Sequence, residues 1–231
     1  MECFFAEFSA RDSEVQLEGD EFRHFRALRK AKGEIVILVN GKGLSAFGYV
    51  KSISKDKVLI KINNFVENLG EIDQKISLAM GILDNKERFE FALEKAVELR
   101  ISEFIPLRTE FTQRKEIDLA RLEKKAISAI KQTIRSRLPS ISLPMDLKSL
   151  AKTFRNYDYV FVLDRAGNME LPKVEFNSAL IIVGPEGGLS KKEIDLCRKR
   201  KNSVLVSLGD FRLRSETSAI AFLSVLHFNL L

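Results

Sequence analysis

The sequence predicts an α/β fold in which a parallel sheet, with helices on both sides, follows a smaller β-rich domain. Beyond residue 75, short apolar runs alternate with amphipathic segments, a pattern typical of parallel sheets with crossover helices. Before Glu67, short strand-like runs surround Asn40-Gly41-Lys42-Gly43, a strong hairpin signal because Asn-Gly accepts positive φ. Between these parts, Leu69–Gln74 has the glycine and acidic residues of a linker.

Length, charge and cysteine usage bound the class of protein. The chain has 231 residues, enough for one or two domains, and a net charge of +6. This basic excess favours a polyanionic partner, with an ordinary basic protein as the alternative. Cys3 and Cys197 lack metal-ligand spacing, so we expect no metal site and a reducing compartment. The N-terminus does not resemble a signal peptide and the apolar tail is short, so we expect a cytoplasmic protein without membrane contact.

In the first part we expect a small β-barrel with one helix. Its helix is expected over Asp20–Lys30, capped by Asp20, with Phe22, Phe25 and Leu28 on one face. The strands are expected at Cys3–Phe8, Glu34–Val39, Phe47–Ile53 and Val58–Val66.

The cations of this helix have two interpretations. Arg23, His24, Arg26 and Arg29, with Lys32 just beyond, are either an ordinary solvated face or a ridge that binds RNA phosphates. In the second case each neutralised phosphate releases counterions, which makes affinity depend steeply on salt. His24 has no neighbour in the sequence that would poise it as a catalyst, so we expect it to pack or to contact phosphate.

In the second part, strands and helices alternate. We expect strands at Lys75–Leu83, Ile101–Leu107, Tyr157–Leu163, Ala179–Val183 and Val204–Leu208. Helices are expected over Lys86–Leu99, from Glu116 to about Ser136, from Ser190, and after a Ser215 or Thr217 cap. Ser190 and Glu193 have capping-box spacing. The last helix is apolar on almost every face, which indicates a core or subunit-interface element.

Two glycine bends follow the last two predicted strands. Gly184-Pro185-Glu186-Gly187-Gly188 follows the first and Gly209 the second, so both bends are expected side by side at the carboxyl ends of neighbouring parallel strands. Ligands bind at that rim, where glycine lets backbone approach closely. The first bend alone could be only a tight turn. Arg212, Arg214 and Glu216 after the second bend favour a site.

The bends carry a specific resemblance. VGPEGGLS and LGDFRLRSETSAIAFL resemble the two signature loops of the RsmE family, SPOUT-superfamily methyltransferases that act on small-subunit ribosomal RNA. HFRALRKAKGE and VNGKG are similar to that family's PUA-like amino-terminal barrel, and ERFEFALEKAVELR is similar to its first methyltransferase helix. The chain departs from the family at Arg100, where glycine is usual, at Lys131, where an acid is usual, and at Cys3, where arginine is frequent.

The resemblance implies a fold, a reaction and a set of residues. It implies a PUA-like RNA-binding barrel over residues 1–68 and, over 75–231, a SPOUT domain with a C-terminal trefoil knot that forms a homodimer. The cofactor would be S-adenosylmethionine, and the substrate N3 of one uridine in small-subunit ribosomal RNA or the assembled subunit. The resemblance assigns the cofactor to Gly184, Glu186, Gly187, Gly188, Leu208, Gly209, Leu213 and Thr217, and adds Gln132 and Arg135 to the RNA-binding residues.

The expected chemistry gives roles to two charged residues. Removing the proton from uridine N3 places negative charge on the O2 and O4 carbonyls, which a guanidinium can stabilise. We expect Arg214 in this role, with Arg212 second. Glu216 is either the proton acceptor or an acid that complements the dipole of the last helix.

Three other functions compete with this prediction. A SPOUT ribose 2′-O-methyltransferase usually carries Asn-Val-Ser where this chain has Arg214-Ser215-Glu216-Thr217. A non-catalytic RNA-binding or ribosome-assembly factor could use the same basic face. A dinucleotide-dependent oxidoreductase is the least supported, because no GxGxxG follows an early strand.

Overall fold

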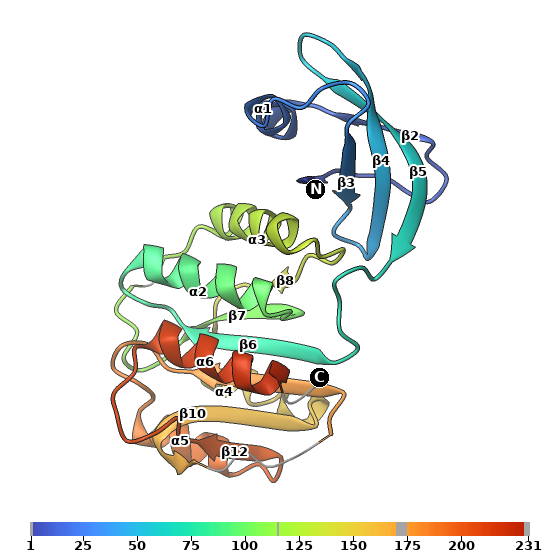
Figure 1. Cartoon of the computed structure of the whole chain (residues 1–231). Helices are drawn as coiled ribbons and strands as arrows, with labels where there is room; N and C mark the ends of the chain where they lie inside the picture. The colour runs from blue at the N-terminus through green and yellow to red at the C-terminus, as the bar shows by residue number, and fades with distance from the viewer. Residues whose placement is uncertain (1, 115, 170–174, 229–231) are drawn as a thin grey trace. The chain divides into compact units, whose positions relative to one another are not determined.

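The computed structural model describes residues 2–114, 116–169 and 175–228, and the chain divides into two compact units (Figure 1). The first unit contains Met1–Glu71 and Ile127–Leu138, and the second contains Ile72–Ala126 and Pro139–Leu231. The segment Ile127–Leu138 comes from within the range predicted for the second domain. Within the first unit, Lys131 of this segment pairs with Glu21 at 2.5 Å, Arg135 pairs with Glu71 at 2.8 Å, and the amide of Leu138 donates to the carbonyl of Gly41.

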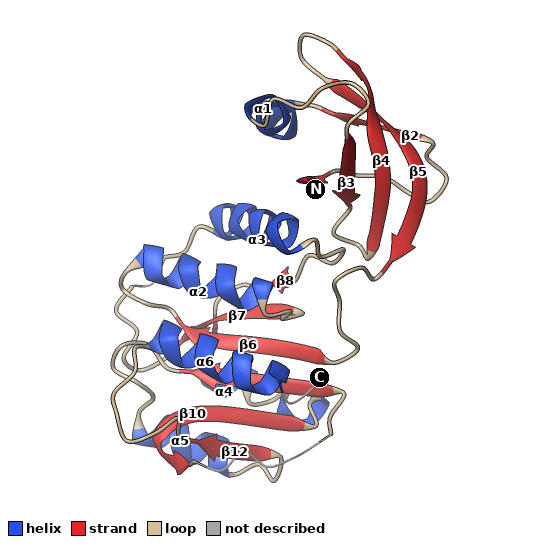
Figure 2. Cartoon of the chain, viewed as in Figure 1, coloured by secondary structure: helices blue, strands red, loops and turns tan. Residues whose placement is uncertain are grey.

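The first unit is built on a curled five-stranded sheet (Figure 2). Its order is β1 (Glu2–Phe5), β3 (Ile35–Val39), β4 (Leu44–Ile53), β5 (Val58–Glu67) and β2 (Glu14–Leu17), with only the β1–β3 pair parallel among the described pairs. The predicted hairpin is confirmed: Gly41 and Gly43 have φ of +72° and +101°, and Asn40 Oδ1 accepts hydrogen bonds from the amides of Lys42 and Leu44.

Helix α1 (Gly19–Ala27) closes the core of this unit with Phe22 and Phe25, which are buried with Phe4. Its ends differ from the prediction. Glu18 occupies the N-cap position without a side-chain hydrogen bond, so Asp20 lies inside the first turn. The helix ends before Lys30 because Arg29 adopts a left-handed φ of +53°, which no helix can continue.

The second unit has the predicted parallel sheet. Its order is β12 (Ser203–Val206), β10 (Tyr159–Asn168), β11 (Ser178–Val183), β6 (Lys75–Gly81), β7 (Glu103–Arg108) and β8 (Ser140–Ile141), with β9 (Met145–Asp146) also on β7. Every described strand pair in it is parallel. The central residues of β6, β7 and β11 are buried and mostly apolar because both faces of the sheet are covered.

Helices cover both faces of this sheet, as predicted. On one face, Phe161 of β10 packs against Phe222 of α6 (Ser215–Phe228), beside α2 (Lys86–Glu98). On the other face, Val160 and Val162 join a core with residues of α4 (Leu147–Leu150) and α5 (Lys191–Arg198). The remaining helical segments are α3 (Leu119–Thr133) and the short turn η1 (Phe154–Asn156).

The end of α2 and the start of α6 are two helix ends whose caps the sequence left open. Helix α2 ends with Arg100 itself in the left-handed conformation, at a φ of +63°, at the position where the sequence resemblance led us to expect glycine. Helix α6 begins at Ser215, so Ser215 and Thr217 lie in its first turn and neither precedes it as a cap. Five short elements of the described residues were not predicted: β2, β8, β9, α4 and η1.

The apolar C-terminal segment forms helix α6, and several of its large side chains are buried. Ala219, Phe222, Leu223 and Leu226 are buried against the sheet and α2, whereas Phe228 is 76% exposed. Leu230 and Leu231 of the predicted tail lie outside the described residues. No helix among the described residues is long and apolar enough to cross a membrane.

Candidate active site

The two glycine bends meet at the carboxyl edge of the parallel sheet, but their strands are not neighbours. Strand β10 lies between β11 and β12, so it contributes a third segment to the space between the bends. This corrects the prediction that the two strands pair directly. The reason is a crossover: β10 precedes both strands in the chain and forms hydrogen bonds with each.

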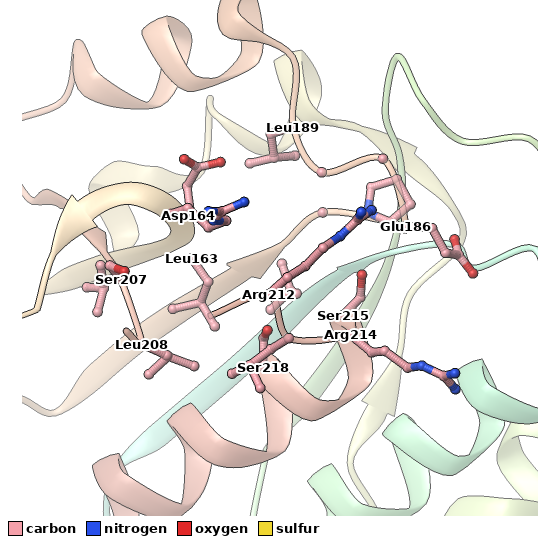
Figure 3. Close-up of a pocket in the computed structure, with 18 of the residues that line it drawn as sticks. Leu163, Asp164, Glu186, Leu189, Ser207, Leu208, Arg212, Arg214, Ser215 and Ser218 are labelled. Carbon is pink, nitrogen blue, oxygen red and sulfur yellow. The ribbon is translucent and has the colours of Figure 1, made fainter. Parts of the chain in front are cut away.

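A cavity of about 770 Å³ opens where these three strands end (Figure 3). Its walls are Leu163 to Arg165 within β10, the first bend from Val183 to Leu189, residues of the second bend between Val206 and Arg214, and the start of α6. Leu163, Leu208 and Leu213 supply apolar wall, while backbone of the bends supplies polar groups. A cavity of this size and mixed character is typical of small-molecule sites.

The first bend is fixed by close backbone packing. The amide of Gly188 donates a hydrogen bond of 2.8 Å to the carbonyl of Pro185, and Gly188 has a φ of +74°. A Cβ on Gly184 would lie 2.5 Å from the carbonyl carbon of Gly188, and a Cβ on Gly81 of β6 would lie 2.3 Å from the nitrogen of Pro185. The predicted capping box is confirmed, with Ser190 Oγ accepting from the amide of Glu193. The bend is therefore held from both sides.

The second bend is tied by Ser207. Its hydroxyl accepts from the amide of Gly209 at 3.3 Å and donates to the carbonyl of Gly209 at 3.2 Å. Gly209 has a φ of +126°, a conformation that favours glycine. The chain then turns into α6, where the amide of Ser218 donates to the carbonyl of Arg214 at 2.8 Å. Arg214 is thereby placed at the rim of the cavity, beside the start of the helix.

An arginine that the sequence did not point to joins the two bends. Arg88, in the first turn of α2, donates from Nε and Nη2 to the two carboxylate oxygens of Glu216 at 2.7 and 2.6 Å. Its Nη1 lies 3.5 Å from Oε1 of Glu186. A fork-shaped pair of this kind is among the stronger side-chain contacts. Arg88 therefore connects helix α2 to the first bend and to helix α6.

This contact sets the charge state of Glu216, which is 7% exposed. Burial by itself would raise the pKa of the carboxyl, but the hydrogen bonds from Arg88 and the positive charges of Arg88 and Arg214 lower it overall. The hydrogen bond to Glu216 in turn raises the pKa of Arg88. Both groups are thus charged at neutral pH, and Glu216 is a weaker base than an ordinary glutamate.

Arg212 and Arg214 leave the second bend in different directions. Figure 3 shows the Arg212 side chain extending across the cavity toward the first bend, and the Arg214 side chain extending away from the start of α6, on the side opposite Leu208. Both side chains are exposed. The rim of the cavity therefore carries two cations that can meet a negatively charged or electron-rich group.

Seven of the eight residues predicted to bind the cofactor line this cavity: Gly184, Glu186, Gly187, Gly188, Leu208, Gly209 and Leu213. Thr217 does not; it is exposed, and Ser218 lines the cavity in its place. Sequence reasoning missed Arg88, Asp164, Arg165 and Ser215. Asp164 and Arg165 carried a usable signal, because polar residues directly after a buried strand of a parallel sheet lie at its binding edge.

The residues predicted to bind RNA have different surroundings. Arg23, Arg26, Arg29, Lys32 and Gln132 are exposed. His24 is half-buried, with its ring centroid 5.3 Å from that of Phe4, so it packs against the core of the first unit. Arg135 is 2% exposed, and Nη2 donates to Glu71 at 2.8 Å. A guanidinium buried in this way holds the first unit together and does not face solvent where a phosphate would lie.

Comparison with known proteins agrees with the geometry. A family model described as an RNA methyltransferase domain matches residues 70–227, and one described as an RNA methyltransferase PUA domain matches residues 17–63. The chain is 32% identical to the ribosomal RNA small subunit methyltransferase E of Mesomycoplasma hyopneumoniae, over 87% of this chain and 88% of that protein. It is 25% identical to the protein of the same name from Bacillus subtilis, over 99% and 96%.

A solved structure has the same fold. A methyltransferase from Legionella pneumophila, determined in complex with the bound cofactor SAM, is 28% identical, with a TM-score of 0.85 over 98% of this chain and 96% of that one. The resemblance found in the two glycine bends is thus confirmed over nearly the full length of the chain. The chain belongs to the RNA methyltransferase family that includes the ribosomal RNA small subunit methyltransferases E.

Proposed function

We propose that this protein uses S-adenosylmethionine to methylate N3 of a uridine in small-subunit ribosomal RNA. The observation that carries the proposal is the cavity between the two glycine bends, with Arg214 at its rim. The names of the relatives support the ribosomal RNA substrate, and the SAM-bound relative supports the cofactor. The choice of uridine N3 rests on the resemblance of the two bends and on the chemistry below.

The residues of the cavity fit this cofactor. Leu163, Leu208 and Leu213 offer apolar surface for an adenine ring, and the backbone of both bends offers hydrogen bonds to its edge. The backbone around Gly188 leaves open space, since a Cβ there would meet nothing within 4 Å. Asp164, also in the wall, places a carboxylate where it can balance a positively charged ligand. When bound, S-adenosylmethionine supplies a methyl group on a positively charged sulfur.

We propose that Arg214 stabilises the uracil anion. Methyl transfer forms the N3–methyl bond, breaks the methyl–sulfur bond and leaves the electron pair on sulfur, while the N3 proton passes to water or a carboxylate. Loss of that proton places negative charge on the uracil carbonyls, and a guanidinium at the rim of the cavity offsets it. The fixed bends add the positioning that aligns acceptor nitrogen and methyl carbon, which can contribute roughly 7–11 kcal/mol.

We assign Glu216 first to the orientation of Arg88, because both of its oxygens accept from that guanidinium and its pKa is lowered. Its role as direct proton acceptor stays a prediction. Glu186 and Thr217 stay predicted cofactor-binding residues, of which Glu186 lies in the wall.

We further propose that the first unit binds the RNA around the acceptor uridine. Exposed Arg23, Arg26, Arg29 and Lys32 on and after α1 form a basic ridge suited to phosphates. The domain ranges 1–68 and 75–231, the trefoil knot and a cytoplasmic location belong to the same proposal. A homodimer, which sedimentation of the intact chain tests, would cover the exposed side chains Val225 and Phe228 at the end of α6.

The test is methyl transfer from labelled S-adenosylmethionine to small ribosomal subunits, and to their naked RNA, from cells that lack this protein. Mass spectrometry of the digested RNA then identifies the product. We expect N3-methyluridine. A 2′-O-methylated nucleoside would assign the chain to the ribose methyltransferases, and no measurable affinity for S-adenosylmethionine would leave it an RNA-binding protein.

A further inference from the structure

A second cavity, of about 740 Å³, adjoins the first. Its wall is formed by the residues at the start of α2, by the turn 110–113 that follows β7, and by Glu186 and Gly187 of the first bend. Arg88, Glu186 and Gly187 line both cavities. The two spaces therefore share a boundary at the carboxyl edge of the sheet, where ligands of parallel α/β proteins bind.

An open aromatic ring faces this second cavity. Phe111 is 45% exposed, although its backbone turn is fixed by a hydrogen bond from the amide of Thr109 to Oγ1 of Thr112. Gly187 allows the ring to pack closely, since a Cβ at Gly187 would lie 2.8 Å from Cβ of Phe111. A phenylalanine that is held in place at the edge of a cavity, with its ring partly open, is a stacking surface for a planar ring.

The charges of this cavity exclude a phosphate and suit an uncharged ring. Three carboxylates, from Asp84, Glu110 and Glu186, line it, against the single guanidinium of Arg88, which Glu216 already holds. An anionic ligand would be repelled by this set. A nucleobase, which has no net charge and two flat faces, would not.

Two side-chain amides complete the wall. Asn85 Oδ1 caps α2 by accepting from the amide of Arg88, which leaves the Asn85 NH2 group without a partner among the described residues. The side chain of Gln113 forms no hydrogen bond with the described part of the chain. Amide NH2 groups donate to carbonyl oxygens, and uracil presents two such oxygens on either side of N3.

We propose that the second cavity receives the acceptor base, a uracil turned out of its RNA strand, stacked on Phe111 with its N3 edge toward the first cavity. The proposal rests on the proposed function, because it places the substrate of that reaction beside its cofactor. A base must leave its stack before an enzyme can reach its N3 edge. The shared boundary at Arg88 and Glu186 is where that edge meets the methyl donor.

The test is Phe111→Ala, with Phe111→Tyr to restore the stacking face. Leu143→Ala is the matched control, because Leu143 is an exposed apolar residue of the same unit, at 72%, outside both cavities. With small ribosomal subunits from cells lacking this protein, we expect Phe111→Ala to raise KM for the subunit by about 5- to 150-fold, the range for loss of one base–aromatic stack. Phe111→Tyr and Leu143→Ala are expected to resemble wild type.

The affinity for S-adenosylmethionine, measured by calorimetry, is expected to be the same in all four proteins. An active wild type with an unchanged KM in Phe111→Ala overturns the proposal. A loss of cofactor affinity in that variant also overturns it, because the second cavity would then hold part of the cofactor.

A direct measurement separates this proposal from the proposed function. Ribosomal RNA containing 5-iodouridine is irradiated with the intact protein, and the crosslinked peptide is identified by mass spectrometry. We expect a crosslink at Phe111 in wild type that is absent in Phe111→Ala. Crosslinks confined to other peptides overturn the assignment, whereas a wild-type protein that forms the crosslink but transfers no methyl group contradicts only the proposed reaction.

Discussion

At the scale of single residues, paired charges of Arg88, Glu216 and Glu186 hold parts of the candidate site in place. Arg88 donates two hydrogen bonds to Glu216 and lies near Glu186. One guanidinium therefore connects two segments that are 30 residues apart in the sequence. Arg214 and Arg212, by contrast, are exposed at the rim of the cavity. The partly buried Arg88, paired with Glu216, therefore holds segments together, and the exposed arginines are available to a substrate.

The first prediction concerns Arg214. We expect Arg214→Ala to lower kcat for methyl transfer by about 10²- to 10³-fold, the usual cost of removing one donor that stabilises a developing anion. Cofactor affinity should change little, since the proposed cofactor contacts come mainly from the backbone of the two bends. Arg212→Ala is the matched control, with a smaller loss expected. Calorimetry and single-turnover rates check this, and equal losses of rate and cofactor affinity would assign Arg214 to the cofactor.

The second prediction concerns the Arg88–Glu216 pair and pH. Because the pKa of Glu216 is lowered in the folded protein, the pair stabilises the fold fully above the ordinary glutamate value of 4.5, and this contribution is lost as pH falls through the lowered value. We expect Glu216→Gln to cost about 1–3 kcal/mol at neutral pH, and the difference from wild type to shrink in acid. Thermal unfolding from pH 3 to 8 measures it.

Kinetics of the same variant separate the two roles of Glu216. If Glu216 acts by orienting Arg88, the Arg88→Ala/Glu216→Gln double variant should lose no more activity than Arg88→Ala alone. A rate that rises with pH in wild type and loses that dependence only in Glu216→Gln would instead identify the carboxylate as the proton acceptor.

Among the elements, the two bends and the strand ends beside them form the site. The first bend packs against β6 through Gly81 and Pro185, and the second is tied by Ser207. Strand β10 separates the two and supplies the floor of the cavity from Leu163 to Arg165. Each bend follows a different strand of the sheet, so the two sides of the cavity are anchored independently.

The third prediction concerns Gly184 and Gly188 of the first bend, which differ in how much space surrounds them. Gly184→Ala should displace the bend, because its Cβ would lie 2.5 Å from the backbone of Gly188, and we expect cofactor affinity to fall by about tenfold or more. The Cβ of Gly188→Ala would meet no atom within 4 Å. Its only expected cost is the strain of an alanine at positive φ, roughly 1–2 kcal/mol of the free energy of unfolding. Calorimetry and thermal unfolding of both variants check this; equal loss of affinity would show that Gly188 faces the cofactor directly.

Across the whole molecule, exposed cations occur in both units, and several of them gather on and after α1 of the first unit. The first unit carries exposed cations on α1, while the second unit carries its cavity with paired charges and carboxylates. The net charge of +6 is small, so phosphate binding must come from local clusters such as the α1 ridge.

The fourth prediction concerns this ridge. We expect Arg26→Ala and Arg29→Ala each to weaken RNA binding and to reduce the slope of log K against log salt by about one. Cofactor affinity should be unchanged. Arg135→Ala is the control: its guanidinium is buried against Glu71, so it should lower stability and leave the salt slope as in wild type. Filter binding at several salt concentrations measures the slopes, and an unchanged slope in Arg26→Ala and Arg29→Ala would remove the ridge from the interface.

The sequence by itself determined the type of fold and most of the predicted cofactor residues that line the first cavity. Apolar runs such as Ala179–Val183 predict buried strands because burial on both faces removes any alternation, and Asn40-Gly41 predicts a hairpin because few other residues accept its backbone angles. The glycines of both bends were found for the same local reason. Helix ends were predicted less well, since Asp20, Ser215 and Thr217 are only three of several residues able to cap.

Only the tertiary structure decided which distant residues share the site. Strand order placed β10 between β11 and β12 and so brought Asp164 to the cavity, and helix packing brought Arg88 to Glu216 across 128 positions of sequence. The pairing of buried Arg135 with Glu71 likewise depends on tertiary packing. Local pattern fixes backbone conformation and which side of an element is buried, but the partner of a charged side chain depends on long-range packing that no short segment contains.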